Sequence, residues 1–110
     1  MTSKYQLFES GRAVADASGR AQVEMRSALW GEWWRVTNTS VNGNSTVEPQ
    51  LKVYRGFVSD SSLIGGSLTG NLDSATGNDV IQPNEAILFV WTGATPGAQF
   101  TATITGERWR

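Results

Sequence analysis

Ala86-Ile-Leu-Phe-Val-Trp91 is an unbroken run of six apolar residues, followed by Thr92-Gly-Ala-Thr-Pro-Gly97 and then by the alternating stretch 98–106. The run is too short for an independent helix and is rich in strand-forming residues, so we predict a strand buried on both faces. The glycines and the proline of the next segment predict a turn. Beyond it, polar and apolar residues alternate with a period of two, as in a strand with one polar face. Together these segments predict a β-hairpin at the centre of a sheet.

Length and composition predict one globular domain over residues 1–110. The chain has 39% apolar and 17% charged residues, which is typical of a folded domain of this length. Its net charge of −1 gives no general attraction to nucleic acid or to an anionic membrane, and no apolar stretch is long enough to span a bilayer. Residues 1–6 lack the apolar segment of a secretory signal. We therefore expect a soluble cytoplasmic product without nucleic-acid or membrane partners.

The residue types available argue against catalysis. The chain contains no cysteine and no histidine, which excludes the usual zinc sites, disulfides, thiol nucleophiles and imidazole bases. The segment 73–79 has a faint likeness to a calcium loop but lacks the alternating oxygen ligands and the closing glutamate, so turn capping explains it better. We expect no enzymatic activity, no cofactor and no metal site.

Further strands are predicted along the rest of the chain. They are residues 4–9 with 12–15 able to pair with them, 21–25, 30–41 and 50–58. Short strands are also predicted near 62–65, within the polar segment 59–77, and near 78–81, directly after it. A helix over 19–29 is the alternative to the strand at 21–25, but strict alternation favours the strand. Seven to nine short strands without a helix predict an all-β, antiparallel β-sandwich or a small barrel. Jelly-roll and immunoglobulin-like connections both remain open.

Five tryptophans are the most unusual feature of the composition. Trp30 and Trp34 fall on one face of the predicted strand 30–41, and Trp33 falls on the other face. We therefore predict that the first two fill the core while Trp33 covers a protein contact; the alternative is a platform on which sugar rings stack. Trp109 stands between Arg108 and Arg110, so it either contacts a partner or folds back over the edge of its own sheet.

Three segments of the sequence resemble small all-β virion proteins of tailed bacteriophages, especially phages of actinobacteria. They contain Tyr54-Arg-Gly56, Thr69-Gly-Asn-Leu-Asp73 and Val90-Trp-Thr-Gly-Ala-Thr-Pro-Gly-Ala98. The resemblance covers about two thirds of the chain, from Trp34 to Gly106. Proteins of that group are capsid decoration or minor capsid proteins, or tail components, rather than enzymes.

The resemblance implies a virion structural protein that is assembled in the host cytoplasm. Its expected partners are the major capsid protein and copies of itself, and glycans are the expected ligands if the chain is instead a carbohydrate-binding module. A decoration protein would act by burying a surface patch on the assembled shell, which it stabilises because it binds only that state. We expect the contact residues to be Trp33, Tyr54 and Trp109, with contributions from Arg108 and Arg110 and from the segment 59–77.

Overall fold

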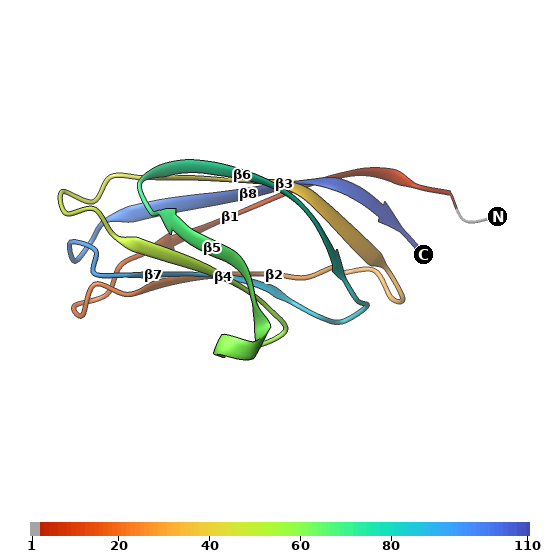
Figure 1. Ribbon diagram of the computed structural model, residues 1–110, viewed down its shortest axis with the longest axis horizontal. Helices are drawn as coiled ribbons and strands as arrows, with labels where there is room; N and C mark the ends of the chain where they lie inside the picture. Colours follow the sequence, from red (N-terminus) through yellow and green to blue (C-terminus); the bar gives the residue numbers. More distant parts are fainter. Residues whose placement is uncertain (1–2) are drawn as a thin grey trace.

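The fold is a sandwich of two antiparallel sheets, each with four strands (Figure 1). The computed structural model describes residues 3–110, without the side chains of residues 60 and 65–68. The strands are β1 (Tyr5–Val14), β2 (Ala21–Met25), β3 (Trp33–Gly43), β4 (Gln50–Arg55), β5 (Leu63–Thr69), β6 (Leu72–Ile81), β7 (Ile87–Thr92) and β8 (Gln99–Trp109), with one short 3₁₀ helix, η1 (Asp60–Ser62). In the described part of the chain, no helix is long and apolar enough to cross a membrane. The predicted β-sandwich is confirmed.

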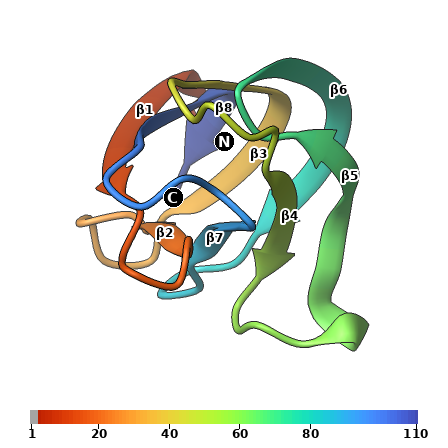
Figure 2. The ribbon, with the colours of Figure 1, turned by 90° about the vertical axis from the view of Figure 1, so that its left-hand side faces the viewer.

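The strand order selects the jelly-roll form of the sandwich. One sheet has the order β1-β8-β3-β6 and the other has the order β2-β7-β4-β5. Strands from the two halves of the chain therefore pair as β1 with β8, β2 with β7, β3 with β6 and β4 with β5. This is a long antiparallel ribbon wound into two layers, which is the jelly-roll arrangement (Figure 2).

The hairpin predicted for residues 86–106 does not form. The first arm, β7, lies between β2 and β4 in one sheet, whereas the second arm, β8, lies between β1 and β3 in the other. Each arm is central in its own sheet, and residues 87–91 are all buried, as predicted for the first arm. The turn crosses between the sheets because Gly97 donates a hydrogen bond to Ala15 and Ala94 donates one to Gly19, so the turn bonds to the β1–β2 connection.

Several strand boundaries also differ from the prediction. β1 is continuous from Tyr5 to Val14, because its pairing with β8 extends without a break through Ser10-Gly11. β3 begins at Trp33 rather than at residue 30, and β4 ends at Arg55 rather than at residue 58. More of the polar segment 59–77 forms strands than expected, since β5 and β6 account for most of it. Alternation in sequence predicts a strand well, but pairing with a neighbour decides where it ends.

The core lies between the sheets and is dominated by large aromatic side chains. Trp34, Phe89, Trp91 and Phe100 are each at most 1% exposed. Trp91 of β7 stacks on Phe100 of β8 with ring centroids 4.9 Å apart, so the two layers meet directly at this pair. The indole Nε1 of Trp91 donates to the Gly70 carbonyl at 3.0 Å, which satisfies its polar atom inside the core.

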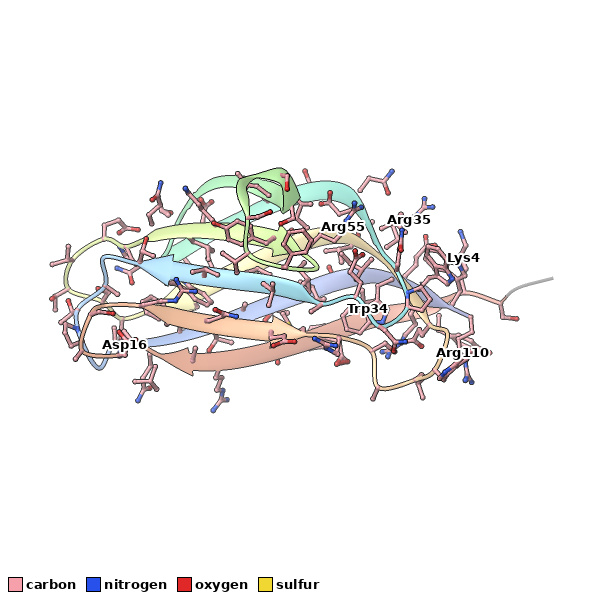
Figure 3. The ribbon with its side chains drawn as sticks, turned by 90° about the horizontal axis from the view of Figure 1, so that it is seen from below. Lys4, Asp16, Trp34, Arg35, Arg55 and Arg110 are labelled. Carbon is pink, nitrogen blue, oxygen red and sulfur yellow. The ribbon has the colours of Figure 1, made fainter. Side chains whose placement is uncertain are left out.

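Both ends of the chain lie at one end of an elongated molecule that measures 49 × 22 × 22 Å (Figure 1). The register explains this, because Tyr5 at the start of β1 is paired with Arg108 at the end of β8. In Figure 3, Lys4, Trp34 and Arg110 lie at this end of the sandwich and Asp16 lies at the other.

Candidate interaction surface

Several exposed apolar side chains, together with the half-buried Trp109, lie at the end of the sandwich that carries the chain termini. We call Tyr5, Leu29, Trp30, Trp33 and Trp109 the end surface. Trp30 is 84% exposed, Tyr5 67%, Leu29 47% and Trp33 36%. Side chains of this size are usually sheltered from water, so several of them together at one end mark a candidate interaction surface.

Trp33 and Trp109 form a stacked pair on the outer face of the β1-β8-β3-β6 sheet. They are direct register partners on β3 and β8, and their rings lie 6.4 Å apart with an angle of 9° between the planes. Cations cover the Trp109 ring, with Lys4 Nζ 5.3 Å and the Arg35 guanidinium 5.8 Å from its centroid. Trp109 therefore packs on its own sheet, and its contact with a partner stays a prediction. Trp33 remains partly open to solvent.

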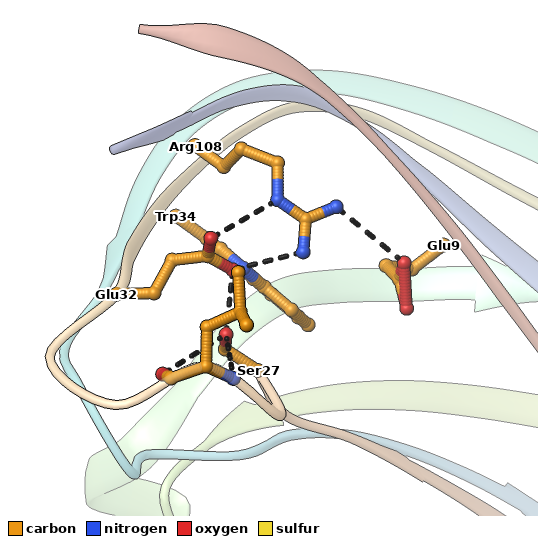
Figure 4. A network of polar contacts seen from close by, with 6 residues as sticks. Glu9, Ser27, Glu32, Trp34 and Arg108 are labelled. Atoms are coloured by element: carbon orange, nitrogen blue, oxygen red, sulfur yellow. Dashed lines mark hydrogen bonds and ion pairs between the residues drawn. The ribbon is translucent and has the colours of Figure 1, made fainter. Parts of the chain in front are cut away.

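Arg108 points in the opposite direction, between the sheets, and is already engaged. Its Nε and Nη2 donate to the two carboxylate oxygens of Glu32 at 3.2 and 2.9 Å, and its Nη1 lies 3.7 Å from Glu9 (Figure 4). The Arg108 side chain is 23% exposed and that of Glu32 is 4% exposed. The structure therefore gives Arg108 a role in holding the fold, and its contact with a partner stays a prediction.

Glu32 is a buried carboxylate with a complete set of donors. Besides Arg108, it accepts hydrogen bonds from Trp34 Nε1 at 2.8 Å and from the Ser27 hydroxyl. Burial opposes ionisation of this carboxylate, but the hydrogen bonds and the guanidinium charge outweigh this effect and lower the pKa of Glu32 to about 2. Charge-assisted hydrogen bonds of this kind are shorter and stronger than neutral ones. The carboxylate therefore stays ionised at neutral pH.

This network also fixes the turn that carries Trp30. The Ser27 hydroxyl accepts a hydrogen bond from the backbone of Leu29 at 3.0 Å, and the Glu32 backbone N–H donates to the Leu29 carbonyl at 3.4 Å. Gly31 has φ +73°, which glycine adopts without strain. The backbone on both sides of Trp30 is thus held from the buried side, while its indole is turned outward.

The exposed position of Trp30 overturns its predicted place in the core. The alternation used for that prediction begins only at Trp33, because the turn at Gly31 interrupts the strand. Trp34 does occupy the core, as predicted, at 1% exposed. The glycine directly after Trp30 was the one signal in the sequence that could have separated these two tryptophans.

Tyr54 offers almost no surface to a partner, since it is 7% exposed. It packs with Ala86, Leu88 and Val90 in a small cluster, and it is the direct register partner of Leu88. Leu88 and Val90 alternate along β7 with residues of the main core, so this cluster lies on the outer face of that sheet. Tyr54 is therefore corrected from a contact residue to a packing residue. Arg110, by contrast, is exposed next to the end surface, as a contact residue requires.

A shallow groove of about 380 Å³ runs into the end surface, with Tyr5, Leu29 and Trp109 as its apolar walls. Glu32 and Arg108 also line it, but their charges neutralise each other. Within the described ranges, no cluster of acidic side chains is suited to hold a metal ion. The arrangement can bury apolar area against another surface. Comparison of the sequence with models of known protein families and with curated proteins gives no match.

Proposed function

We propose that the protein is a non-enzymatic structural component of a bacteriophage particle, a capsid decoration or minor capsid protein that binds the assembled shell through the end surface. The observation that carries the proposal is Trp30, which is 84% exposed on a turn that a buried ion pair holds in place. A tryptophan presented in a fixed conformation is a typical binding hot spot, because little conformational entropy is lost when it is buried.

The architecture and the sequence support the same proposal. Jelly rolls are a frequent architecture of viral capsid domains and of lectins, although a fold by itself does not specify a function. The segments that resemble phage virion proteins include β7 and the turn after it, and every residue of the end surface lies outside them. A decoration protein needs a stable body and a separate contact surface, and the two are separate in this molecule.

The first test is the copy number of the chain in purified particles, measured by quantitative mass spectrometry relative to the major capsid protein. A number comparable to that of the capsid protein supports decoration. A handful of copies would assign the chain to the tail or to a vertex, and absence from the particle would overturn the proposal.

The second test is rebinding of variants to particles that lack the protein. We expect Trp30→Ala to weaken binding at least about tenfold, as for a hot-spot aromatic. Phe57→Ala is the matched control, because Phe57 is a 63% exposed aromatic outside the end surface. Equal binding by both variants would exclude Trp30 as the contact.

Glycan binding is the second candidate function, and the exposure of Trp30 and Trp33 favours it. Titration with a panel of polysaccharides should then shift the tryptophan fluorescence of the wild type, and the shift should be lost in Trp30→Ala or in Trp33→Ala. An unchanged spectrum across the panel would remove this candidate.

A further inference from the structure

The sheet that contains β3 is irregular at one point in its middle. Between Val36 and Asn38 the register shifts on both sides of the strand. On the β8 side, Val36 pairs with Gly106 and Asn38 pairs with Thr105, so β3 has one more residue than β8 at this point. On the β6 side, Val36 pairs with Asp79 and Asn38 pairs with Thr76, so β6 has one more residue than β3. Bulges of this kind bend strands and occur frequently next to functional sites.

A small cavity opens at this irregularity. It has a volume of about 130 Å³, and its lining runs from the exposed residues Asn38 and Thr76 to the interior residues Val53, Ile64 and Ile87. Val53 is 2% exposed and Ile87 is 0% exposed, so the floor is part of the core. A cavity of roughly 150 Å³ with apolar walls is large enough for a molecule the size of benzene. This one therefore accepts a small apolar group that enters from the outer surface.

One ionisable side chain lines the cavity, and it is Asp79. Among the described residues, its carboxylate has neither a hydrogen bond nor an ion pair within 4.0 Å. Burial raises the pKa of Asp79, with Arg55 acting in the opposite direction. Arg55 also interacts with two other groups, because its Nε lies 3.7 Å from Glu85 and its Nη1 donates a hydrogen bond to the Val80 carbonyl. The three charged groups together leave one negative charge near the cavity.

We propose that this cavity binds a primary ammonium group on a short alkyl chain, with the ammonium at Asp79 and the chain over Val53 and Ile87. An ammonium would supply the hydrogen-bond donors that the carboxylate lacks, and pairing would offset the cost of its partial burial. The alkyl chain would cover apolar floor atoms that are otherwise open to water. Free alkylamines carry this chemistry, and so does a lysine side chain. The proposal is independent of the end surface.

The test uses n-butylammonium chloride as the probe and the full chain as the target, with chemical shifts of β3 and β6 amides measured by NMR. For so small a ligand we expect saturable binding in roughly the millimolar range. Asp79→Asn should weaken it at least about tenfold, because the charge is removed while the shape is kept. Glu24→Gln is the matched control, since it removes one exposed carboxylate on the other sheet and should leave binding unchanged.

Two further probes separate the charge from the cavity. n-Butanol has the same chain without the charge, and it should bind at least about tenfold more weakly. Ala75→Leu fills the cavity while it retains Asp79, so it should abolish the shifts if the alkyl chain enters. Thermal melts of each variant confirm that it is folded. Equal binding by Asp79→Asn, or shifts caused by any salt at the same ionic strength, would overturn the proposal.

A pH titration and a second amine complete the test. Binding should decline as the pH falls through the raised pKa of Asp79. The charged group that acts on Asp79 is Arg55, and Glu85 is in turn paired with Arg55. Nα-acetyl-lysine amide tests the source: binding by both amines shows that the cavity admits a lysine side chain, whereas binding by butylammonium alone restricts the ligand to free alkylamines. A pH-independent affinity down to the ordinary aspartate range would contradict the assignment to Asp79.

Discussion

Glu32 and Asp79 are both carboxylates that lie at least partly between the sheets, and their environments act on them in opposite directions. Glu32 accepts hydrogen bonds from a guanidinium, an indole and a hydroxyl, and its pKa falls to about 2. Asp79 lines a cavity with an apolar floor, and burial raises its pKa.

The difference shows that hydrogen-bond donors, rather than burial alone, decide the direction in which the pKa of such a carboxylate shifts. Glu32 is the more deeply buried of the two, yet its pKa is the one that is lowered, because a guanidinium, an indole and a hydroxyl all donate to its carboxylate. It therefore holds the fold at the end surface. Asp79 retains unused hydrogen-bonding capacity, and unused capacity is what a ligand can satisfy.

The largest expected effect concerns the backbone beside the Asp79 cavity. A Cβ added at Gly106 would lie 1.9 Å from the Arg35 carbonyl oxygen, so Gly106→Ala cannot be accommodated without displacing a strand. We expect a loss of about 4 kcal/mol or more in the free energy of unfolding, measured by urea denaturation. Gly93→Ala is the control, because Gly93 has φ +75° but open space around it, and it should lose only about 1 kcal/mol. Similar losses in both variants would show that β3 and β8 can separate.

Glu32→Gln tests the donor-rich site directly. The change leaves the Arg108 guanidinium partly buried without its main partner, and we expect the free energy of unfolding to fall by about 3 kcal/mol. Glu24→Gln, which removes an exposed carboxylate, should change it by less than about 0.5 kcal/mol. If the two variants were equally stable, the network would be dispensable for the fold.

The pH dependence of stability separates the two carboxylates by sign. The pKa of Glu32 is lowered from 4.5 to about 2, so its contribution of about 3 kcal/mol is present above pH 4.5 and is lost as the pH falls towards 2. Asp79 has a raised pKa, so its protonation favours the folded state as the pH falls through that value. In urea titrations from neutral to acid pH, the free energy of unfolding should therefore fall more steeply in Asp79→Asn than in the wild type. In Glu32→Gln it should fall less steeply. The reverse order would refute the assignment.

The smallest expected effect is that of Trp30→Ala. Because this side chain is 84% exposed and the turn is held from its buried side, the free energy of unfolding should change by less than about 0.5 kcal/mol. Thermal denaturation measures this directly. A marked destabilisation would mean that Trp30 supports the network, and its loss of particle binding could then no longer be read as a contact effect.

The candidate site was only partly predictable from the sequence. Trp33 and Arg110 are open to solvent, as a contact role requires, but Tyr54 and Arg108 are committed to packing and to an ion pair. Alternation assigns a side chain to a face of a strand, yet it cannot say whether that face is covered. For Tyr54, a second cluster on the outer face of its sheet buries it. For Trp30, a turn removed it from the strand altogether.

Local sequence patterns were sufficient to predict that the chain is all-β and where its most deeply buried strands lie. Residues 21–25 and 87–91 carry period-two alternation and an unbroken apolar run, and such local patterns are set by the backbone geometry of a strand. These patterns did not reveal which strands pair, because β7 and β8 lie next to each other in sequence but in different sheets. The roles of Glu32 and Asp79 follow from that pairing. The charged donor to Glu32, Arg108, lies 76 residues away along the chain, and the cavity at Asp79 is lined by residues of β3, β4, β5 and β7 as well as its own strand. Long-range contacts, which no local pattern encodes, make one carboxylate a structural ion and leave the other open to a ligand.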